Sequence, residues 1–245
     1  MTAGPVSTGI GEDGAMEPSS DPFDLPFGDV LAPGDQTRLA EFRKAFTRFG
    51  MVYKFAIDEL TTKVRILQEE FTQVHDYNPI EHVTTRLKSV ESLAVKAERK
   101  GVALTLASIQ ASILDIAGVR IVCSFVSDVY ETFDLLTKQA DVEVLDVEDY
   151  IANPKPNGYQ SLHATIRIPV FLSTGAELVP VEIQFRTVAM DFWASLEHKI
   201  FYKYDKAVPA EILDELRETA AVASALDRRM EHLHRRVHGP HGADS

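Results

Sequence analysis

Two short stretches of this chain carry side chains that could bind and activate a nucleotide. The first, Lys155–His163 (KPNGYQSLH), combines a cation, an amide, an aromatic ring and an imidazole. The second, Val181–Thr187 (VEIQFRT), holds one carboxylate, Glu182, inside an apolar strand pattern. Aromatic rings stack on bases, and carboxylates hold divalent metals or accept protons. Together the two stretches predict a purine-nucleotide site with a metal or base residue at its floor.

The polar residues of both stretches should share one face of a sheet, because side chains alternate between the two faces of a strand. In the later strand that face would carry Glu182, Gln184 and Arg186. In the earlier strand it would carry His163, Thr165 and Arg167. A solvent-exposed sheet surface gives the same pattern, and we prefer that interpretation for Thr165 and Arg167. For His163 and Glu182 we favour a functional role.

A second carboxylate could join Glu182. Asp115 lies between an apolar helix end and the strand predicted from about Val119, so it could project from the sheet edge toward Glu182. Two carboxylates over a sheet suit Mg²⁺, which takes oxygen ligands and leaves positions open for phosphate oxygens. The alternative is a structural aspartate at a helix C-terminus that bonds a nearby backbone amide.

The basic segment Thr85–Lys100 could bind phosphate. Ser89 would cap a helix there, one face of which would carry Ser92, Lys96, Arg99 and Lys100. Hydroxyl, ammonium and helix-end amide groups can cradle a triphosphate without a Walker loop, which the chain lacks. Alone, a basic helix is more often a solvated face, but the neighbouring motifs favour phosphate binding.

The loop within Lys155–His163 suits base recognition. Gly158 permits a close backbone approach, and the ring of Tyr159 can stack on a base. Pro154 and Pro156 stiffen the loop, which lowers the entropic cost of holding it ready. The alternative is a structural turn with Tyr159 packed inward.

The elements that must position these residues follow from periodicity and turn signals. Helices are predicted at about 36–74, 90–100, 106–116, 128–139, 187–203 and after Pro209, and strands at about 118–126, 142–149, 161–172 and 177–186. The first helix could break near Gly50. Strands interleaved with helices predict a mixed α+β fold, with a mixed sheet flanked by helices and long N- and C-terminal helices.

We expect four segments. Residues 1–35 hold seven acids and no base and should form a disordered acidic arm. The main domain would span 36–208, and 239–245 would be a flexible tail. The helix at 209–238 repeats Ile212, Leu216, Thr219, Ala223, Leu226, Met230, Leu233 and Val237 at heptad spacing. So narrow a stripe favours packing against a partner helix over docking on its own domain.

Composition limits the partners and the location. The net charge is −12, of which the arm supplies seven charges, so the body is only weakly acidic and duplex DNA is disfavoured. No apolar run reaches the roughly 18 residues of a membrane helix. The first basic residue is Arg38, so we expect no secretory leader. The single Cys123 should be a buried small hydrophobe in a reducing compartment, and the cytoplasm is expected.

The motifs resemble a known family. Arg86-x-Lys88, Asp115–Arg120, Lys155–His163 and Glu182–Thr187 occur in the order and spacing of the (p)ppGpp synthetase domain of the RelA/SpoT family. The later run from Phe192 to Tyr204 is similar to the small alarmone synthetases. This resemblance, over about residues 40–235, implies a nucleotidyltransferase-like sheet and a pyrophosphokinase for stringent-response alarmone synthesis. The 3′-hydroxyl of GTP or GDP would attack the β-phosphorus of ATP and release AMP, and no product hydrolysis is expected.

The resemblance also implies roles for individual residues. Asp115 and Glu182 would hold Mg²⁺, and Glu182 would also activate the hydroxyl. The ATP site would comprise Arg86 and Arg120 around the adenine, and Lys88, Ser92, Lys96 and Arg99 on the phosphates. The GTP site would comprise Tyr159 on the guanine, with Lys155, Asn157, His163 and Gln184 orienting the nucleotide. Small members of the family assemble through terminal helices, which favours a homotetramer.

Two other functions fit the same residues. One is a nucleotidyltransferase that attacks the α-phosphorus and releases pyrophosphate. The other is a non-catalytic nucleotide or single-stranded RNA-binding module, which the basic segment and Tyr159 permit. In that case the pair Asp115 and Glu182 would have no purpose.

Overall fold

The core of the protein is one five-stranded sheet. The computed structural model describes residues 21–25, 36–75, 77–203 and 208–238. The strands are β1 (Ile80–Leu87), β2 (Ala117–Cys123), β3 (Glu143–Asp149), β4 (Leu162–Leu172) and β5 (Gly175–Thr187), in the order β1-β2-β5-β4-β3. The pair β2–β5 is parallel, whereas β1–β2, β4–β5 and β3–β4 are antiparallel. The predicted mixed sheet is therefore confirmed.

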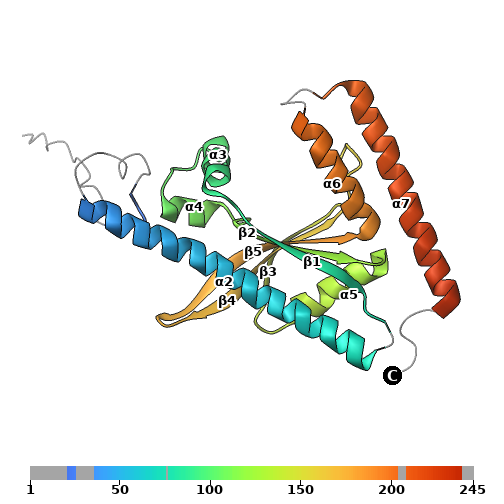
Figure 1. Ribbon diagram of the computed structural model, residues 1–245, viewed down its shortest axis with the longest axis horizontal. Helices are drawn as coiled ribbons and strands as arrows, with labels where there is room; N and C mark the ends of the chain where they lie inside the picture. Colours follow the sequence, from blue (N-terminus) through green and yellow to red (C-terminus); the bar gives the residue numbers. More distant parts are fainter. Residues whose placement is uncertain (1–20, 26–35, 76, 204–207, 239–245) are drawn as a thin grey trace, which may run out of the picture.

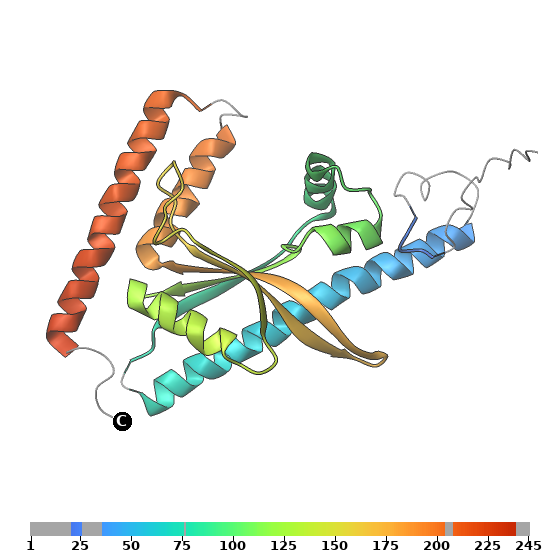
Figure 2. The ribbon, with the colours of Figure 1, turned by 180° about the vertical axis from the view of Figure 1, so that it is seen from behind.

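Helices cover one face of this sheet and flank its ends (Figures 1 and 2). They are α2 (Gln36–Val74), α3 (Val90–Lys100), α4 (Leu106–Ser112), α5 (Val126–Thr137), α6 (Val188–Lys203) and α7 (Ala210–His238). The helices α2 and α5 bury their apolar sides against the sheet in one continuous core. To one side of the sheet lie α3 and α4, and to the other side α6 and α7 pack side by side. The second face of β4 and β5 stays polar and accessible.

The long helix α2 runs through Gly50 without the break that the sequence allowed. Its buried positions recur every three or four residues, at Ala45, Phe49, Val52, Tyr53, Ala56, Ile57, Leu60 and Val64. Because buried contacts lie on both sides of Gly50, tertiary packing outweighs the local weakness of one glycine in a helix. The buried Cys123 behaves as predicted, since burial raises the pKa of its thiol to about 12.

Two elements differ from the sequence prediction. Strand β1 was not predicted, because it is an edge strand with mostly exposed side chains and lacks a clear alternation of burial. The helix predicted at 106–116 ends at Ser112, where Ile113 takes an extended conformation. This early end places Asp115 in the connection before β2. By contrast, α3 begins after Ser89, whose side chain caps it as expected.

A short piece of the acidic arm lies against the body. At residues 21–25 the chain turns, and Leu25 is buried. Phe23 packs on the main core, and its carbonyl accepts a 3.0 Å hydrogen bond from the amide of Ala107 at the start of α4. The rest of 1–35, and the tail 239–245, lie outside the described residues. In the part that is described, no helix has the length and apolarity to cross a membrane.

Candidate active site

Strand register brings the predicted polar residues together on the uncovered face. Thr165 pairs with Glu182 and His163 with Gln184 between β4 and β5. On the other side of β5, Gly118 pairs with Glu182 and Arg120 with Gln184. The apolar side chains of the same strands are buried beneath. Glu182 and Gln184 therefore lie between the residues expected for ATP and those expected for GTP.

Asp115 and Glu182 line one cavity of about 340 Å³. Its other charged residues are Arg86, Lys88 and Arg120. Glu182 is half-buried, and burial together with the negative charge of Asp115 raises the pKa of its carboxyl. Two carboxylates from separate parts of the chain thus converge, as the sequence predicted.

Asp115 is held by two lysines through one oxygen. Its Oδ2 accepts hydrogen bonds from Lys96 Nζ at 2.5 Å and from Lys88 Nζ at 3.1 Å. Burial alone would raise the pKa of Asp115, but these two ammonium groups outweigh it and lower that pKa. Its Oδ1 is buried and has no hydrogen-bond partner among the described residues. An unpaired carboxylate oxygen, on a residue that lines the same cavity as Glu182, fits a hard divalent cation that completes its shell with water and phosphate oxygens.

A second cavity, of about 450 Å³, adjoins the first and shares Lys88 and Asp115 with it. Its other polar lining comes from α3: Glu91, Ser92, Lys96 and Arg99. The N-terminus of α3 faces the same region, with Ser89 bonded to the amide of Ser92 at 3.3 Å. Ammonium, guanidinium and hydroxyl groups around one hollow suit a polyphosphate.

Arg86 and Arg120 stand on neighbouring strands at the first cavity. Arg86 lies opposite Gly118 in the β1–β2 pairing, and Arg120 lies opposite Thr84. Arg86 is exposed, whereas Arg120 is half-buried and forms an ion pair with Asp191 of α6 at 3.1 Å. Burial, and then the nearby charge of Arg186, lower the pKa of Arg120. Two planar guanidinium groups beside one cavity can enclose an aromatic base.

The loop before β4 is a tight turn pressed against α7. The carbonyl of Lys155 accepts from the amide of Gly158 at 2.8 Å, and Gly158 has φ +90°. A Cβ at Gly158 would lie 2.5 Å from the Cβ of Ala220. Lys155 Nζ lies 4.1 Å from the centre of the Tyr150 ring, and the Asn157 side chain donates to Glu197 of α6 at 3.0 Å. Both sides of this loop are therefore anchored.

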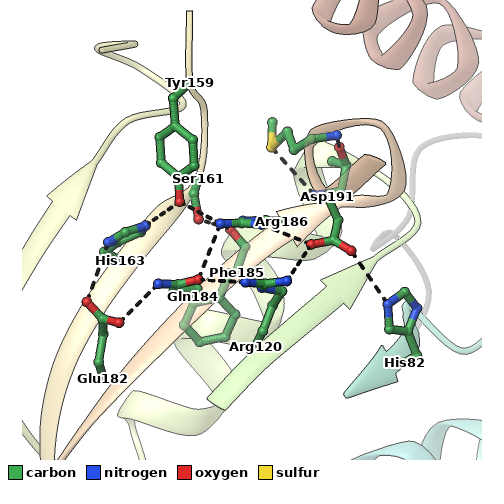
Figure 3. A network of polar contacts seen from close by, with 12 residues as sticks. His82, Arg120, Tyr159, Ser161, His163, Glu182, Gln184, Phe185, Arg186 and Asp191 are labelled. Carbon is green, nitrogen blue, oxygen red and sulfur yellow. Dashed lines mark hydrogen bonds and ion pairs between the residues drawn. The ribbon is translucent and has the colours of Figure 1, made fainter. Parts of the chain in front are cut away.

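Tyr159 is half-buried, and its hydroxyl is fixed from two sides (Figure 3). Arg186 donates to it at 2.8 Å, and it lies 2.8 Å from His163 Nε2. A phenol oxygen can accept two hydrogen bonds, so the donor between Tyr159 and Nε2 depends on the imidazole tautomer. The opposite imidazole nitrogen, Nδ1, lies 3.8 Å from Glu182. Burial, and then the charge of Lys155, lower the pKa of His163 to about 4. The imidazole is therefore neutral near pH 7.

Residues 85–207 match the family described as "Region found in RelA / SpoT proteins". The chain is 51% identical over 180 residues to the GTP pyrophosphokinase YwaC of Bacillus subtilis, covering 74% of this chain and 86% of that protein. It is 38% identical over 191 residues to the GTP pyrophosphokinase YjbM of the same organism, covering 78% and 89%. The chain belongs to the RelA/SpoT family.

Solved structures agree on the fold of this RelA/SpoT protein. The small alarmone synthetase 2 of Bacillus subtilis superposes with a TM-score of 0.72 at 47% identity, covering 78% of this chain and 98% of that one. The small alarmone synthetase 1 of the same organism, bound to its product pppGpp, gives 0.73 at 38% identity, with coverage of 80% and 99%. A second structure of that synthetase, bound to AMPCPP, gives 0.68 at 34% identity, with coverage of 80% and 100%.

Some residues of this RelA/SpoT site escaped the sequence analysis. Tyr150 contacts Lys155, and Asp191 joins Arg120 to Arg186, yet neither was singled out. Arg186 was placed on the polar face without a role. The available signal was weak: an acid in the first turn of the helix that follows the VEIQFRT motif.

Proposed function

We propose that this protein, a GTP pyrophosphokinase, transfers the β,γ-pyrophosphate of ATP to the 3′-hydroxyl of GTP or GDP. The bond from the 3′-oxygen to the β-phosphorus forms, the bond from that phosphorus to the α,β-bridging oxygen breaks, and AMP departs. The observation that carries this proposal is the placement of Glu182, which lies between the cationic cavities on one side and the Tyr159 loop on the other.

On the ATP side, one of the two adjoining cavities would bind the adenine and the other would bind the phosphates. The adenine would lie between Arg86 and Arg120, whose guanidinium planes can stack on a base. The phosphates would extend toward α3, where Lys88, Ser92, Lys96 and Arg99 line the second cavity. Such transfers depend mainly on positioning and on neutralising charge, so a cationic cradle is the expected machinery.

On the GTP side, Tyr159 would stack on the guanine. Lys155 and Asn157 would orient the nucleotide from the loop, and His163 and Gln184 from the sheet. Because the His163 imidazole is neutral, it can donate a hydrogen bond without adding charge beside Glu182. The acceptor hydroxyl would thereby face both Glu182 and the phosphate cradle.

Glu182 would accept the proton of the attacking hydroxyl. Burial and Asp115 raise the pKa of Glu182, which makes its carboxylate a better proton acceptor. Asp115 and Glu182 would hold Mg²⁺, which when bound neutralises phosphate charge and lowers the cost of the developing negative charge. The free Oδ1 of Asp115 supports this assignment.

We also propose a homo-oligomer, with a tetramer favoured, in the cytoplasm. Between α6 and α7 lies a groove of about 850 Å³, and we call its apolar lining, Phe192, Leu196, Val222, Leu226 and Met230, the α6–α7 groove. Phe192 and Val222 are 67% and 69% exposed. A large apolar surface on a helix pair supports contact with a second copy. The buried, unpaired Cys123 supports a reducing compartment.

A product-resolved assay tests the activity. The full chain is incubated with Mg²⁺, labelled ATP and GTP, and the nucleotides are separated by chromatography. We expect equal amounts of AMP and a guanosine pentaphosphate, and a tetraphosphate when GDP replaces GTP. Release of ADP or free pyrophosphate would contradict the proposal, the latter in favour of attack at the α-phosphorus.

Two variants sharpen this assay. Glu182→Gln should abolish turnover while calorimetry still detects nucleotide binding, because the amide keeps the shape but cannot take the proton. The control is Glu177→Gln, on the same strand but paired with Arg48 outside the site, which should leave turnover unchanged. Nucleotide binding without any product in the unmodified protein would instead indicate a non-catalytic nucleotide or RNA-binding module.

A further inference from the structure

Arg186 occupies a central place between the two nucleotide sites. It is 5% exposed and reaches from β5 toward both sides (Figure 3). Its NH2 donates to the Tyr159 hydroxyl at 2.8 Å and to Gln184 Oε1 at 3.3 Å. Its NH1 donates to Asp191 Oδ1 at 2.9 Å. The Nε has no hydrogen-bond partner among the described residues, and the guanidinium carbon lies 5.2 Å from the centre of the Tyr159 ring.

Asp191 is the matching anion. The same Oδ1 that binds Arg186 accepts from Arg120 NH1 at 3.1 Å. Its Oδ2 lies 3.9 Å from His82 Nε2 of β1 (Figure 3). The carboxylate is 18% exposed, so water screens it only partly. One aspartate thus separates two guanidinium groups that would otherwise repel each other at close range.

We infer that Arg186 and Asp191 are positioning residues that together fix one recognition group in each nucleotide site. Arg186 holds the Tyr159 ring for the guanine, and Asp191 holds Arg120 for the adenine. The inference deepens the proposed function and rests on it for the identity of the two ligands. Neither residue needs to touch a nucleotide, because each acts through a neighbour that does.

The geometry explains why arginine is needed at position 186. Its planar fork reaches Tyr159 with one nitrogen and Asp191 with the other. Lysine offers a single ammonium point and cannot span both partners in the same way. A hydrogen bond from a charged group to a half-buried partner is worth about a tenfold change in affinity or somewhat more.

The guanine side is tested by a double-mutant cycle with Arg186→Lys and Tyr159→Phe. Calorimetry on the full chain measures the Kd of GTP alone and of a non-hydrolysable ATP analogue with a methylene group between the α- and β-phosphorus. Each single change should weaken GTP binding about tenfold, because each breaks the hydrogen bond between Arg186 and Tyr159. The double variant should lose clearly less than the product of the two single losses, because that shared bond can be lost only once. Additive losses would overturn this half of the inference.

The adenine side has its own cycle, with Asp191→Asn and Arg120→Met. Asp191→Asn should weaken the ATP analogue about tenfold, because Arg120 loses the anion that orients it. Adding Asp191→Asn to Arg120→Met should cost nothing further. This cycle stays decisive even where Arg186→Lys lowers folding yield. A further loss of ATP affinity in the double variant would overturn the role of Asp191.

A matched control separates positioning from general damage. Arg167→Lys alters another arginine on the same face of the sheet, paired with Glu143 at 2.9 Å and away from the cavities. It should leave both Kd values unchanged, and all variants should melt near the temperature of the unmodified protein. Binding without product in the unmodified protein would reject the proposed reaction, while the cycles would still decide the positioning roles. Turnover with additive cycles would reject the positioning roles alone.

Discussion

Asp115 and Glu182 line the same cavity, yet their surroundings move their pKa values in opposite directions. Two lysines bind Asp115 and lower its pKa, so it stays ionised. No lysine or arginine of the described residues forms a salt bridge with Glu182, and burial and the charge of Asp115 raise its pKa. One carboxylate is thus suited to holding charge and the other to taking a proton.

A pH experiment tests the environment of His163. Its pKa falls from 6.5 to about 4 on folding, so the unfolded chain binds a proton in this range that the folded chain does not. The stabilising contribution is present above about pH 6.5 and is lost as the pH falls toward 4. Urea unfolding without nucleotide should therefore show that the protein loses about 2 kcal/mol more than His163→Gln between pH 7 and 4.5. Parallel stability curves would show that the imidazole is not buried as described.

At the scale of residues, the sequence predicted on which face of the sheet a side chain lies, but it did not predict which side chains form ion pairs. Period-2 alternation correctly placed His163 and Glu182 on one polar face, because a strand leaves no other choice. It could not pair Arg120 with Asp191, since that contact joins β2 to α6 and depends on how the helix docks. Long-range ion pairs have no local signature. The assigned roles of the site residues stay predictions until the variants are measured.

Among the elements, the long helices and the central strands could be predicted from the sequence, whereas the edge strand β1 could not. Helix α2 and strands β4 and β5 have a strong period because one side of each is buried. Strand β1 has little burial to impose a period, although its Val and Thr residues favour a strand. The consequence was that Arg86 was read as part of a basic segment, whereas it lies on a strand beside Arg120.

The contact between the Tyr159 loop and α7 gives a test at the level of elements. Gly158→Ala would place a Cβ 2.5 Å from the Cβ of Ala220 at a φ of +90°, so the loop must shift. We expect GTP binding to weaken about tenfold, with the ATP analogue unaffected, as calorimetry would show. Adding Ala220→Gly should restore part of the loss by removing the collision.

The control for this change is Gly175→Ala, in the β4–β5 turn. That glycine also has positive φ, +126°, but a Cβ there would meet nothing within 4 Å. It carries the backbone strain without the collision and should leave GTP binding intact. Equal losses from both glycine changes would mean that strain, and not contact with α7, is responsible.

For the whole molecule, the α6–α7 groove is an extended apolar surface that the single chain leaves uncovered. Leu226 and Met230 are 53% and 48% exposed there. If a second copy covers the groove, Leu226→Glu buries an unpaired charge and should weaken self-association by about a hundredfold or more. Analytical ultracentrifugation would show a smaller species at micromolar concentration.

A charge change elsewhere on the same helix controls for net charge. Arg228 is exposed on α7 but does not line the groove. Arg228→Glu should leave the sedimentation profile unchanged. Two outcomes would contradict the proposed assembly. One is an unmodified protein that sediments as a monomer, and the other is a Leu226→Glu variant that sediments at the same size as the unmodified protein.

The short docked piece of the acidic arm has a practical consequence for anyone who trims this protein. Phe23 packs against the core and lines a small hollow together with Phe49, Val52 and Tyr53, and its carbonyl accepts a hydrogen bond from the amide of Ala107. A truncated protein that starts at α2 would expose apolar surface there, and the amide of Ala107 in the first turn of α4 would lose its hydrogen bond to Phe23. Because α4 leads directly into Asp115, shortening the N-terminal region would disturb the support of an acidic group in the reaction centre.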